Sequence, residues 1–194
     1  MTEFPAEYSA EERRWLLRLA HQSIRAAVTG TKFTLPGSSA HLKEARGAFT
    51  TLHENGKLRG CIGYVMAVAP LDKTIVDTAR AAALEDPRFD PVTEAELENL
   101  QLEISVLSPM FEIAPEDVVV GRHGLMVSYG GRRGLLLPQV PEEWGWDRES
   151  YLAQTCRKAG LAEDSWKKGA KLEAFTAEVF GEKEPGESLR SKSE

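Results

Sequence analysis

Two stretches of the chain repeat apolar residues at helical spacing. Ser9 and Glu12 have the spacing of a capping box, and the apolar residues that follow every three or four positions predict a helix that ends at Gly30. A second apolar stripe predicts a helix over residues 71–84. The Asp86-Pro87 pair ends this helix, because proline disfavours the helical conformation of the residue before it.

A hairpin is the clearest strand signal. Asn55-Gly56 separates two strand-like runs, 47–53 and 58–65. This pair favours a type I′ turn, because both central residues of that turn take positive φ. A two-residue turn pairs Glu54 with Lys57 and, counting outward, Thr50 with Cys61.

This register divides the hairpin into two faces, because side chains alternate along a strand. The expected core face holds Leu58, Gly60, Ile62, Phe49 and Thr51. The opposite face holds Arg59, Cys61, Gly63, Thr50 and Leu52.

Further strands and helices complete the pattern. Strands are predicted over 101–108, 124–129, 132–137 and 171–180, and helical segments over 93–99, 115–118 and 147–159. Since strands and helices are mixed and the sheets are built from hairpins, the sequence predicts an α+β fold with an antiparallel sheet flanked by helices.

Composition and charge narrow the class of protein. The chain has 194 residues, with 24 Lys and Arg against 30 Asp and Glu, and the net charge of −6 argues against binding nucleic acid through its phosphates. No apolar run approaches the ~18 residues of a membrane span, and the N-terminal sequence does not resemble a secretory signal. We therefore expect a cytoplasmic protein with reduced cysteines. Residues 1–181 are expected to form one domain that could divide into two lobes, followed by a polar, disordered tail over 182–194.

The segment 58–63 carries the strongest candidate for chemistry. Cys61 lies two residues from Arg59, about 7 Å along the strand, and a nearby guanidinium favours thiolate over thiol. Gly60 and Gly63 weaken a strand and often mark the close approach of a ligand or another backbone. Cys61 is thus a candidate nucleophile, with Arg59, Gly60 and Gly63 as candidate binding residues. The alternative is a small buried core residue, the commoner environment of a free cysteine.

Arg88 stands between two Asp-Pro pairs, Asp86-Pro87 and Asp90-Pro91. The prolines could fix its guanidinium as an anion-binding fork, which makes Arg88 a candidate binding residue. The alternative is a rigid double turn that packs Phe89 in the core and ties Arg88 to one of the aspartates, because Asp-Pro pairs form turns in their own right.

The four histidines show no metal-ligand spacing, and the sequence has no HExxH, CxxC, P-loop or dinucleotide-binding motif. No metal site and no cofactor is therefore predicted. His53 is expected on the face opposite Cys61, which argues against it as the base of a Cys–His pair. His41, in the loop before the hairpin, stays open as a partner.

Several separated motifs, in order along the chain, resemble the AMMECR domain family, protein A of the AmmeMemoRadiSam system. The signature is carried by residues 46–52 and by 58–63, which read LRGCIG. Matching segments follow at 81–91, 102–108, 134–140 and 156–161. The resemblance covers nearly the whole chain except its ends.

The resemblance implies an α+β fold with a larger and a smaller lobe and a cleft between them. It implies partners more than an activity, since the system combines this protein with a Memo-like protein and a radical SAM protein. It assigns no catalytic residue, so that Arg59, Gly60, Cys61 and Gly63 are signature positions only.

Two functions remain open. The protein is either a component or adaptor that recruits a partner in such a modification system, or an enzyme that uses Cys61 in a groove with Arg59 and Arg88 to modify RNA or protein. The surroundings of Cys61 distinguish them: an accessible thiol beside a cation and a base favours catalysis, and an aliphatic environment favours a structural role.

Overall fold

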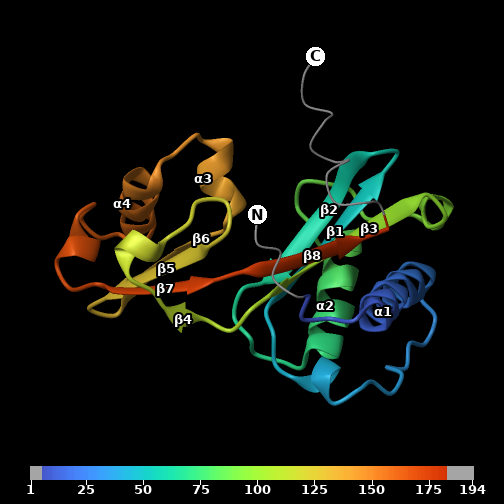
Figure 1. The fold of residues 1–194 in the computed structure, drawn as a ribbon. Helices are drawn as coiled ribbons and strands as arrows, with labels where there is room; N and C mark the ends of the chain where they lie inside the picture. The colour runs from blue at the N-terminus through green and yellow to red at the C-terminus, as the bar shows by residue number, and fades with distance from the viewer. Residues whose placement is uncertain (1–5, 183–194) are drawn as a thin grey trace. The chain divides into compact units, whose positions relative to one another are not determined.

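The computed structural model describes residues 6–182, and the chain divides into two compact units (Figure 1). Of the described residues, unit 1 contains 6–107 and 178–182, and unit 2 contains Ser108–Ala177. Each unit has its own four-stranded sheet, its own helices and its own apolar core. The expected α+β class is confirmed.

The long helices of unit 1 follow the apolar pattern of the sequence. Helix α1 spans Ala10–Thr29, and α2 spans Leu71–Leu84. The expected capping box is present at Ser9 and Glu12, and Gly30 ends α1 with a φ of 66°. No helix among residues 6–182 is both long enough and apolar enough to cross a membrane.

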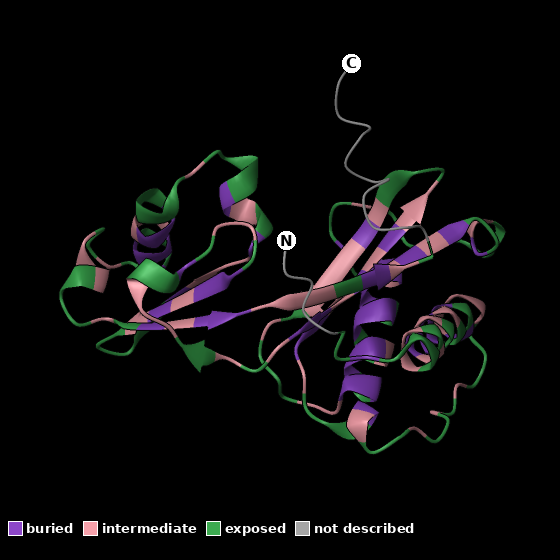
Figure 2. Ribbon diagram, viewed as in Figure 1, coloured by how far each residue is buried: buried purple, intermediate pink, exposed green. Residues whose placement is uncertain are grey.

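The sheet of unit 1 has the strand order β2-β1-β3-β8, so that β2 and β8 are its two edges. Its strands are β1 (Ala48–Glu54), β2 (Lys57–Tyr64), β3 (Leu100–Leu107) and β8 (Ala177–Gly181). Helix α2 packs on β1 and β2, and α1 packs on α2 and β3. Figure 2 shows α2 largely buried against these strands. The core between them includes Leu16, Leu52, Ile75, Leu102 and Ile104.

Unit 2 is built around a second sheet, with the order β4-β7-β5-β6. Its strands are β4 (Phe111–Glu112), β5 (Gly124–Tyr129), β6 (Arg132–Leu136) and β7 (Lys171–Phe175). The short helix α3 (Gln139–Glu143) precedes α4 (Arg148–Lys158), which Asp147 caps and which packs on β5 and β6. The expected segments 93–99 and 115–118 form single 3₁₀ turns, Glu94–Glu96 and Pro115–Asp117.

The prediction of one strand over 171–180 is wrong. Strand β7 ends at Phe175 and β8 begins at Ala177, and the two strands belong to different sheets. At the residue between them, the Thr176 N–H donates to Ser108 Oγ (3.0 Å), and the Thr176 carbonyl accepts from the Ser108 N–H (2.9 Å). The sequence gives no turn signal at this break, because residues 171–180 contain neither glycine nor proline and no run of polar residues.

The expected tail over 182–194 lies outside the described residues except for Glu182. The Glu182 carboxylate accepts a hydrogen bond from the Leu102 N–H (2.9 Å) and lies 2.7 Å from His21 Nε2. Glu182, expected as the first residue of the tail, therefore contacts unit 1.

The turn of the first hairpin has the expected conformation. Asn55 and Gly56 have φ values of 52° and 77°, as a type I′ turn requires. Glu54 pairs with Lys57 and His53 with Leu58, as predicted.

Beyond these pairs a β-bulge changes the register. Arg59 is left unpaired, so that Leu52 pairs with Gly60 and Thr51 with Cys61. The expected pairing of Thr50 with Cys61 is therefore wrong by one residue. An extra residue in one strand cannot be seen in the alternation of its partner, which explains the error.

The bulge also changes which residues share a face. The core face holds Gly60 and Ile62 with the buried residues Ala48, Thr50 and Leu52. Phe49 and Thr51, expected in the core, instead lie opposite Gly63 and Cys61 on the other face. Cys61 itself is on the face away from the core, as predicted.

Replacing Gly56 with valine tests the turn. A β-branched residue is strained at a φ of 77°, and we expect Gly56→Val to lower the free energy of unfolding by more than ~1 kcal/mol. Urea denaturation measures the loss. Asn55→Gly, which tolerates the same conformation, is the control and should change stability by less than half as much. Equal stability of the wild type and Gly56→Val would contradict the type I′ assignment.

Candidate functional site

Gly60 brings strand β2 into direct contact with the backbone of helix α2. A Cβ atom at this position would lie only 2.2 Å from the Ala82 carbonyl oxygen, far inside van der Waals contact. The glycine is thus explained by the close approach of another backbone, one of the two alternatives that the sequence allowed. As a consequence, the segment that follows α2 emerges beside the outer edge of β2.

Asp86 and Arg88 cover that edge at Cys61. The Cys61 N–H donates to Asp86 Oδ2 (2.8 Å), and Arg88 Nη2 donates to the Cys61 carbonyl (3.3 Å). These two side chains provide the acceptor and the donor that a neighbouring strand would provide. The polar backbone of an edge strand is satisfied in this way without a further strand.

Asp86 holds Arg88 in place. Asp86 Oδ1 accepts from the Arg88 backbone N–H (3.1 Å) and Nε (3.0 Å), and Oδ2 accepts from Nη2 (2.7 Å). The hydrogen bonds from Arg88 hold the pKa of the buried Asp86 carboxyl well below its usual range. Burial opposes that shift, and the bond from the Cys61 N–H adds to it.

Arg88 combines the two alternatives weighed for it. It is tied to Asp86, as the double turn predicts, yet 54% of its side chain is exposed. Phe89, expected in the core by the same interpretation, is only half-buried, and its ring lies 5.5 Å from the Arg88 guanidinium. One side of a fixed guanidinium is therefore available to solvent.

The Cys61 thiol is half-buried and lies among polar groups. Thr51 Oγ1 donates a hydrogen bond to Cys61 Sγ (3.2 Å) from the paired strand. The Asp86 carboxylate is the main cause that raises the pKa of Arg88, and the Cys61 sulfur adds to the effect. Because its Nη2 donates to the Cys61 carbonyl, Arg88 is the cation that the structure places at Cys61.

Arg59, the cation that the sequence placed next to Cys61, is engaged elsewhere. Its Nε donates to Glu96 Oε1 (2.6 Å) and its Nη1 to the Asp90 carbonyl (2.9 Å). Only 15% of its side chain is exposed. The hydrogen bond from Arg59 lowers the pKa of Glu96 to about 2, against the effect of burial. Arg59 therefore fastens the 3₁₀ turn Glu94–Glu96 to the bulge in β2.

The remaining signature glycine and the nearby histidines take other positions. Gly63 pairs with Phe49, whose ring occupies the place of a side chain at Gly63. His53 lies on the same face of β1 as Thr51, which removes the argument that it faces away from Cys61. Among residues 6–182, however, no hydrogen bond joins Cys61 to a histidine, and no group of three or more His, Cys, Asp and Glu side chains could hold a metal ion.

Cys156 differs from Cys61 in its surroundings. It is fully buried in the core of unit 2 with Tyr151 and Leu152. Burial raises the pKa of its thiol. The two cysteines therefore offer a matched pair of accessible and inaccessible thiols.

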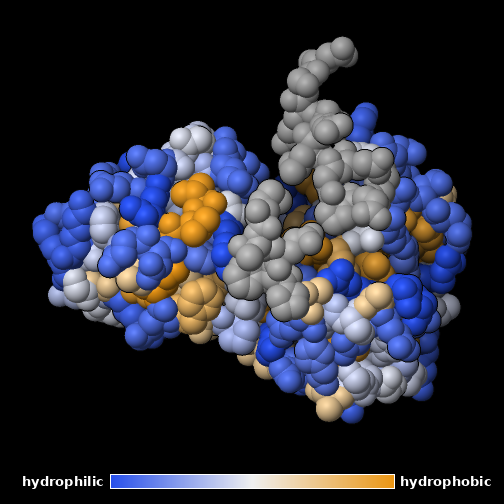
Figure 3. All heavy atoms as spheres, viewed as in Figure 1, coloured by the Kyte–Doolittle hydropathy of each residue, from blue (hydrophilic) through white to orange (hydrophobic). Residues whose placement is uncertain are grey.

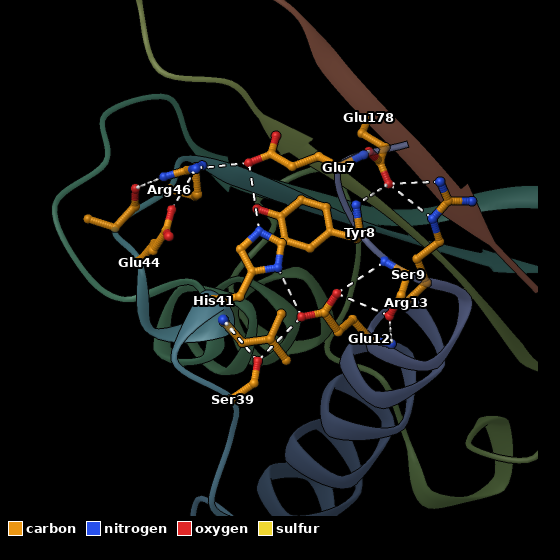
Figure 4. Close-up of polar contacts among 12 residues, drawn as sticks. Glu7, Tyr8, Ser9, Glu12, Arg13, Ser39, His41, Glu44, Arg46 and Glu178 are labelled. Atoms are coloured by element: carbon orange, nitrogen blue, oxygen red, sulfur yellow. Dashed lines mark hydrogen bonds and ion pairs between the residues drawn. The ribbon is translucent and has the colours of Figure 1, made fainter. Parts of the chain in front are cut away.

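A second group of polar side chains, which the sequence did not predict, surrounds residues 7 and 8 (Figure 4). The Glu178 carboxylate of β8 accepts from the backbone N–H groups of Glu7 (2.6 Å) and Tyr8 (3.4 Å) and also binds Arg13. Arg46 Nη2 donates to the Glu7 carboxylate (2.8 Å).

His41 completes this group. Its ring stacks on Tyr8 with 4.8 Å between centroids, and its Nδ1 lies 2.9 Å from Glu12 Oε1. His41, open as a partner of Cys61, is thus committed to Glu12 and Tyr8. Arg46 is the first residue of the family signature that was recognised in the sequence. Glu178 lies 170 positions beyond Tyr8, and no local pattern connects them.

Gly60→Ala tests the contact between β2 and α2. The added Cβ has no space beside the Ala82 carbonyl, and overpacking of this kind costs about 1–3 kcal/mol of folding free energy. Gly37→Ala is the matched control, because no atom lies within 4 Å of its Cβ position. Thermal unfolding should show a clear loss for Gly60→Ala alone, and equal midpoints would contradict the close contact.

Asp86→Asn tests the charge at the edge of β2. The pKa of Asp86 is lower in the folded chain than its ordinary value of 3.8, so the carboxylate stabilises the fold above that value and the stabilisation is lost as the pH falls below it. At pH 7 the substitution should cost about 2 kcal/mol, the contribution of charged hydrogen bonds. Denaturation between pH 6 and pH 3 should show a smaller pH dependence for the variant, and parallel curves would contradict this role.

Comparisons with known proteins agree on the relationship of this chain. It is 43% identical to a protein of Thermococcus onnurineus, over 92% of this chain and 94% of the other, and 42% identical to protein MJ0810 of Methanocaldococcus jannaschii, over 94% and 96%. A crystal structure of the uncharacterized protein PH0010 from Pyrococcus horikoshii matches with a TM-score of 0.73 and 42% identity, over 93% of this chain and 96% of that one. The model of the AMMECR1 family matches residues 17–180, and the chain therefore belongs to the AMMECR1 family.

Proposed function

We propose that this protein is a cytoplasmic binding component of a modification system, and that it acts with Memo-like and radical SAM partners. Membership of the AMMECR1 family supports the choice of partners through the system that the family resemblance implies. The geometry at the outer edge of β2 supports a binding role, and the proposed contact point is Arg88 with Cys61 beside it.

The observation that carries this proposal is the state of Arg88. Asp86 fixes its guanidinium through a bidentate contact, and more than half of the side chain is exposed. A guanidinium that is already ordered loses little conformational entropy on binding. Its Nε and Nη2 donate to Asp86 and to the Cys61 carbonyl, so that Nη1 is the group left to donate to a carboxylate. The edge of β2 thus presents a preformed point of contact for an acidic group of a partner.

A second function is favoured by the contacts of the thiol. Thr51 donates a hydrogen bond to Cys61 Sγ, and Arg88 donates one to the Cys61 carbonyl. A half-buried cysteine beside a hydroxyl and a guanidinium has the kind of polar, partly exposed surroundings in which nucleophilic cysteines are found. An enzyme that uses Cys61 together with Arg88 is therefore the alternative. Arg59 has no part in this version, because Glu96 and the Asp90 carbonyl occupy its guanidinium.

Separate substitutions of Arg88 and Cys61 distinguish the two functions. We expect Arg88→Ala to weaken binding of the purified Memo-like protein from the same organism at least tenfold by calorimetry, and Cys61→Ser to change it less than twofold. Arg80→Ala is the control, since Arg80 has a similar exposure of 52% but lies on α2. Unchanged affinity in Arg88→Ala would overturn the binding role, and loss of modification activity in Cys61→Ser with unchanged affinity would favour the enzyme.

The two cysteines should react at different rates with iodoacetamide at pH 7.5. Cys61 is partly accessible and lies beside a cation, whereas Cys156 is buried with a raised pKa, so Cys61 should react at least tenfold faster. Arg88→Ala should slow the reaction of Cys61, and Arg59→Ala should change it less. Mass spectrometry of the folded protein measures both rates. Equal, slow reaction at both cysteines would remove the support for a reactive Cys61.

A further inference from the structure

The segment Ala6–Ser9 is bound to unit 1 in the way that a protein binds a peptide. Glu178 accepts hydrogen bonds from two successive backbone N–H groups, those of Glu7 and Tyr8. Arg13 holds the Glu178 carboxylate from the other side at 2.9 Å. Backbone recognition of this kind does not depend on the side chains of the bound segment.

Two side chains of the segment are recognised separately. Arg46 binds the Glu7 carboxylate at 2.8 Å, and the His41 ring stacks on Tyr8 with an interplanar angle of 12°. We call His41, Arg46 and Glu178 the receiving site. They come from a 3₁₀ helix, from the residues before β1 and from β8, and all three lie within the part of the chain that matches the family.

The fit of the segment in the receiving site is incomplete. The Tyr8 hydroxyl is buried, as the residue is only 1% exposed, and it has no hydrogen-bond partner among residues 6–182. Arg46 Nε is also buried without a partner in the described part of the chain. Burying unpaired polar atoms opposes binding, so the segment is held less tightly than the site allows.

The charges around the site define what it accepts. Arg46 also binds Glu44 (2.8 Å), and His41 lies near Glu12 (2.9 Å) and Glu7 (3.9 Å). The acidic group of a ligand therefore has to reach Arg46 itself, where Nε offers a second donor beside Nη2. A carboxylate that bound both atoms would satisfy the buried Nε, which Glu7 leaves unpaired.

We propose that the receiving site is a peptide-binding site for a partner segment in which an acidic residue precedes an aromatic one, and that the chain's own Glu7-Tyr8 occupies it as a displaceable internal ligand. The proposal goes beyond the contact at the edge of β2 and does not depend on it. Release of Glu7 and Tyr8, with Ser9 kept as the N-cap of α1, frees the backbone acceptor, the guanidinium and the ring-stacking surface together, so that one event opens the whole site.

A labelled peptide tests the proposal on the full chain. The probe is fluorescein-labelled Ala-Glu-Tyr-Ser-amide, the sequence of the internal ligand, and its binding is measured by fluorescence anisotropy. An internal ligand competes at an effective concentration of about a millimolar, so the wild type should bind the probe weakly. The double variant Glu7→Ala/Tyr8→Ala should bind it at least tenfold more tightly.

Two controls separate a site from a general loosening of the fold. Tyr8→Phe keeps the ring and removes the unpaired hydroxyl, which opposes binding of the segment, so this variant should bind the probe no more tightly than the wild type. A probe with alanine in place of tyrosine should bind the double variant at least tenfold less tightly than the original.

The outcomes decide the proposal. Tight, ring-dependent binding by the folded double variant supports it, and no binding up to 1 mM overturns it. If circular dichroism shows that the double variant is unfolded, Glu7→Ala alone is used, because it opens Arg46 and leaves Tyr8 in place. A gain of at least threefold in that variant then supports the proposal, and an affinity equal to that of the wild type overturns it.

Discussion

The direct contact between the backbones of β2 and α2 determines most of what surrounds the signature hairpin. Only glycine fits at position 60, since any side chain would overlap the Ala82 carbonyl. The contact brings the end of α2 next to the edge of the sheet. Asp86 follows two residues after α2 ends and accepts the N–H of Cys61 from there. Asp86 also holds the Arg88 guanidinium, which donates to the Cys61 carbonyl. Gly60, Cys61, Asp86 and Arg88 therefore form one connected group of residues.

Much of the fold could be predicted because its signals are local. The capping box at Ser9, the apolar stripe of α2 and the Asn55-Gly56 turn each depend on a few neighbouring residues, and each is confirmed. The bulge at Arg59 was not predictable, since one extra residue leaves the sequence pattern of the hairpin unchanged. Because of the bulge, Thr51 and not Thr50 pairs with Cys61. The cation that contacts Cys61 is Arg88, whereas Arg59, which was expected there, binds Glu96.

The sites were harder to predict because they join distant parts of the chain. Cys61 and Arg88 were candidates from the sequence, but their connection runs through Asp86, which could be seen only as part of a turn. Glu178 and Tyr8 gave no signal at all. An exposed strand with a glutamate and a polar segment before a helix are both common, and only the folded chain brings them together.

Each edge strand of the unit 1 sheet takes part in contacts with an arginine–carboxylate pair, but the two pairs are held in different ways. At β2 the pair is Asp86 and Arg88, which follow α2 in the chain and bind the backbone of Cys61. At β8 the strand itself supplies the carboxylate, Glu178, and what it binds is a short segment before α1. Asp86 closely follows a helix that packs on β2, so this contact stays in place as long as the helix does. Glu178 instead holds a segment that, as proposed above, another chain can replace. The visible faces of both units are mostly hydrophilic, with only separate hydrophobic patches (Figure 3). Both proposed contact sites accordingly use arginine–carboxylate pairs and backbone groups rather than a broad apolar surface.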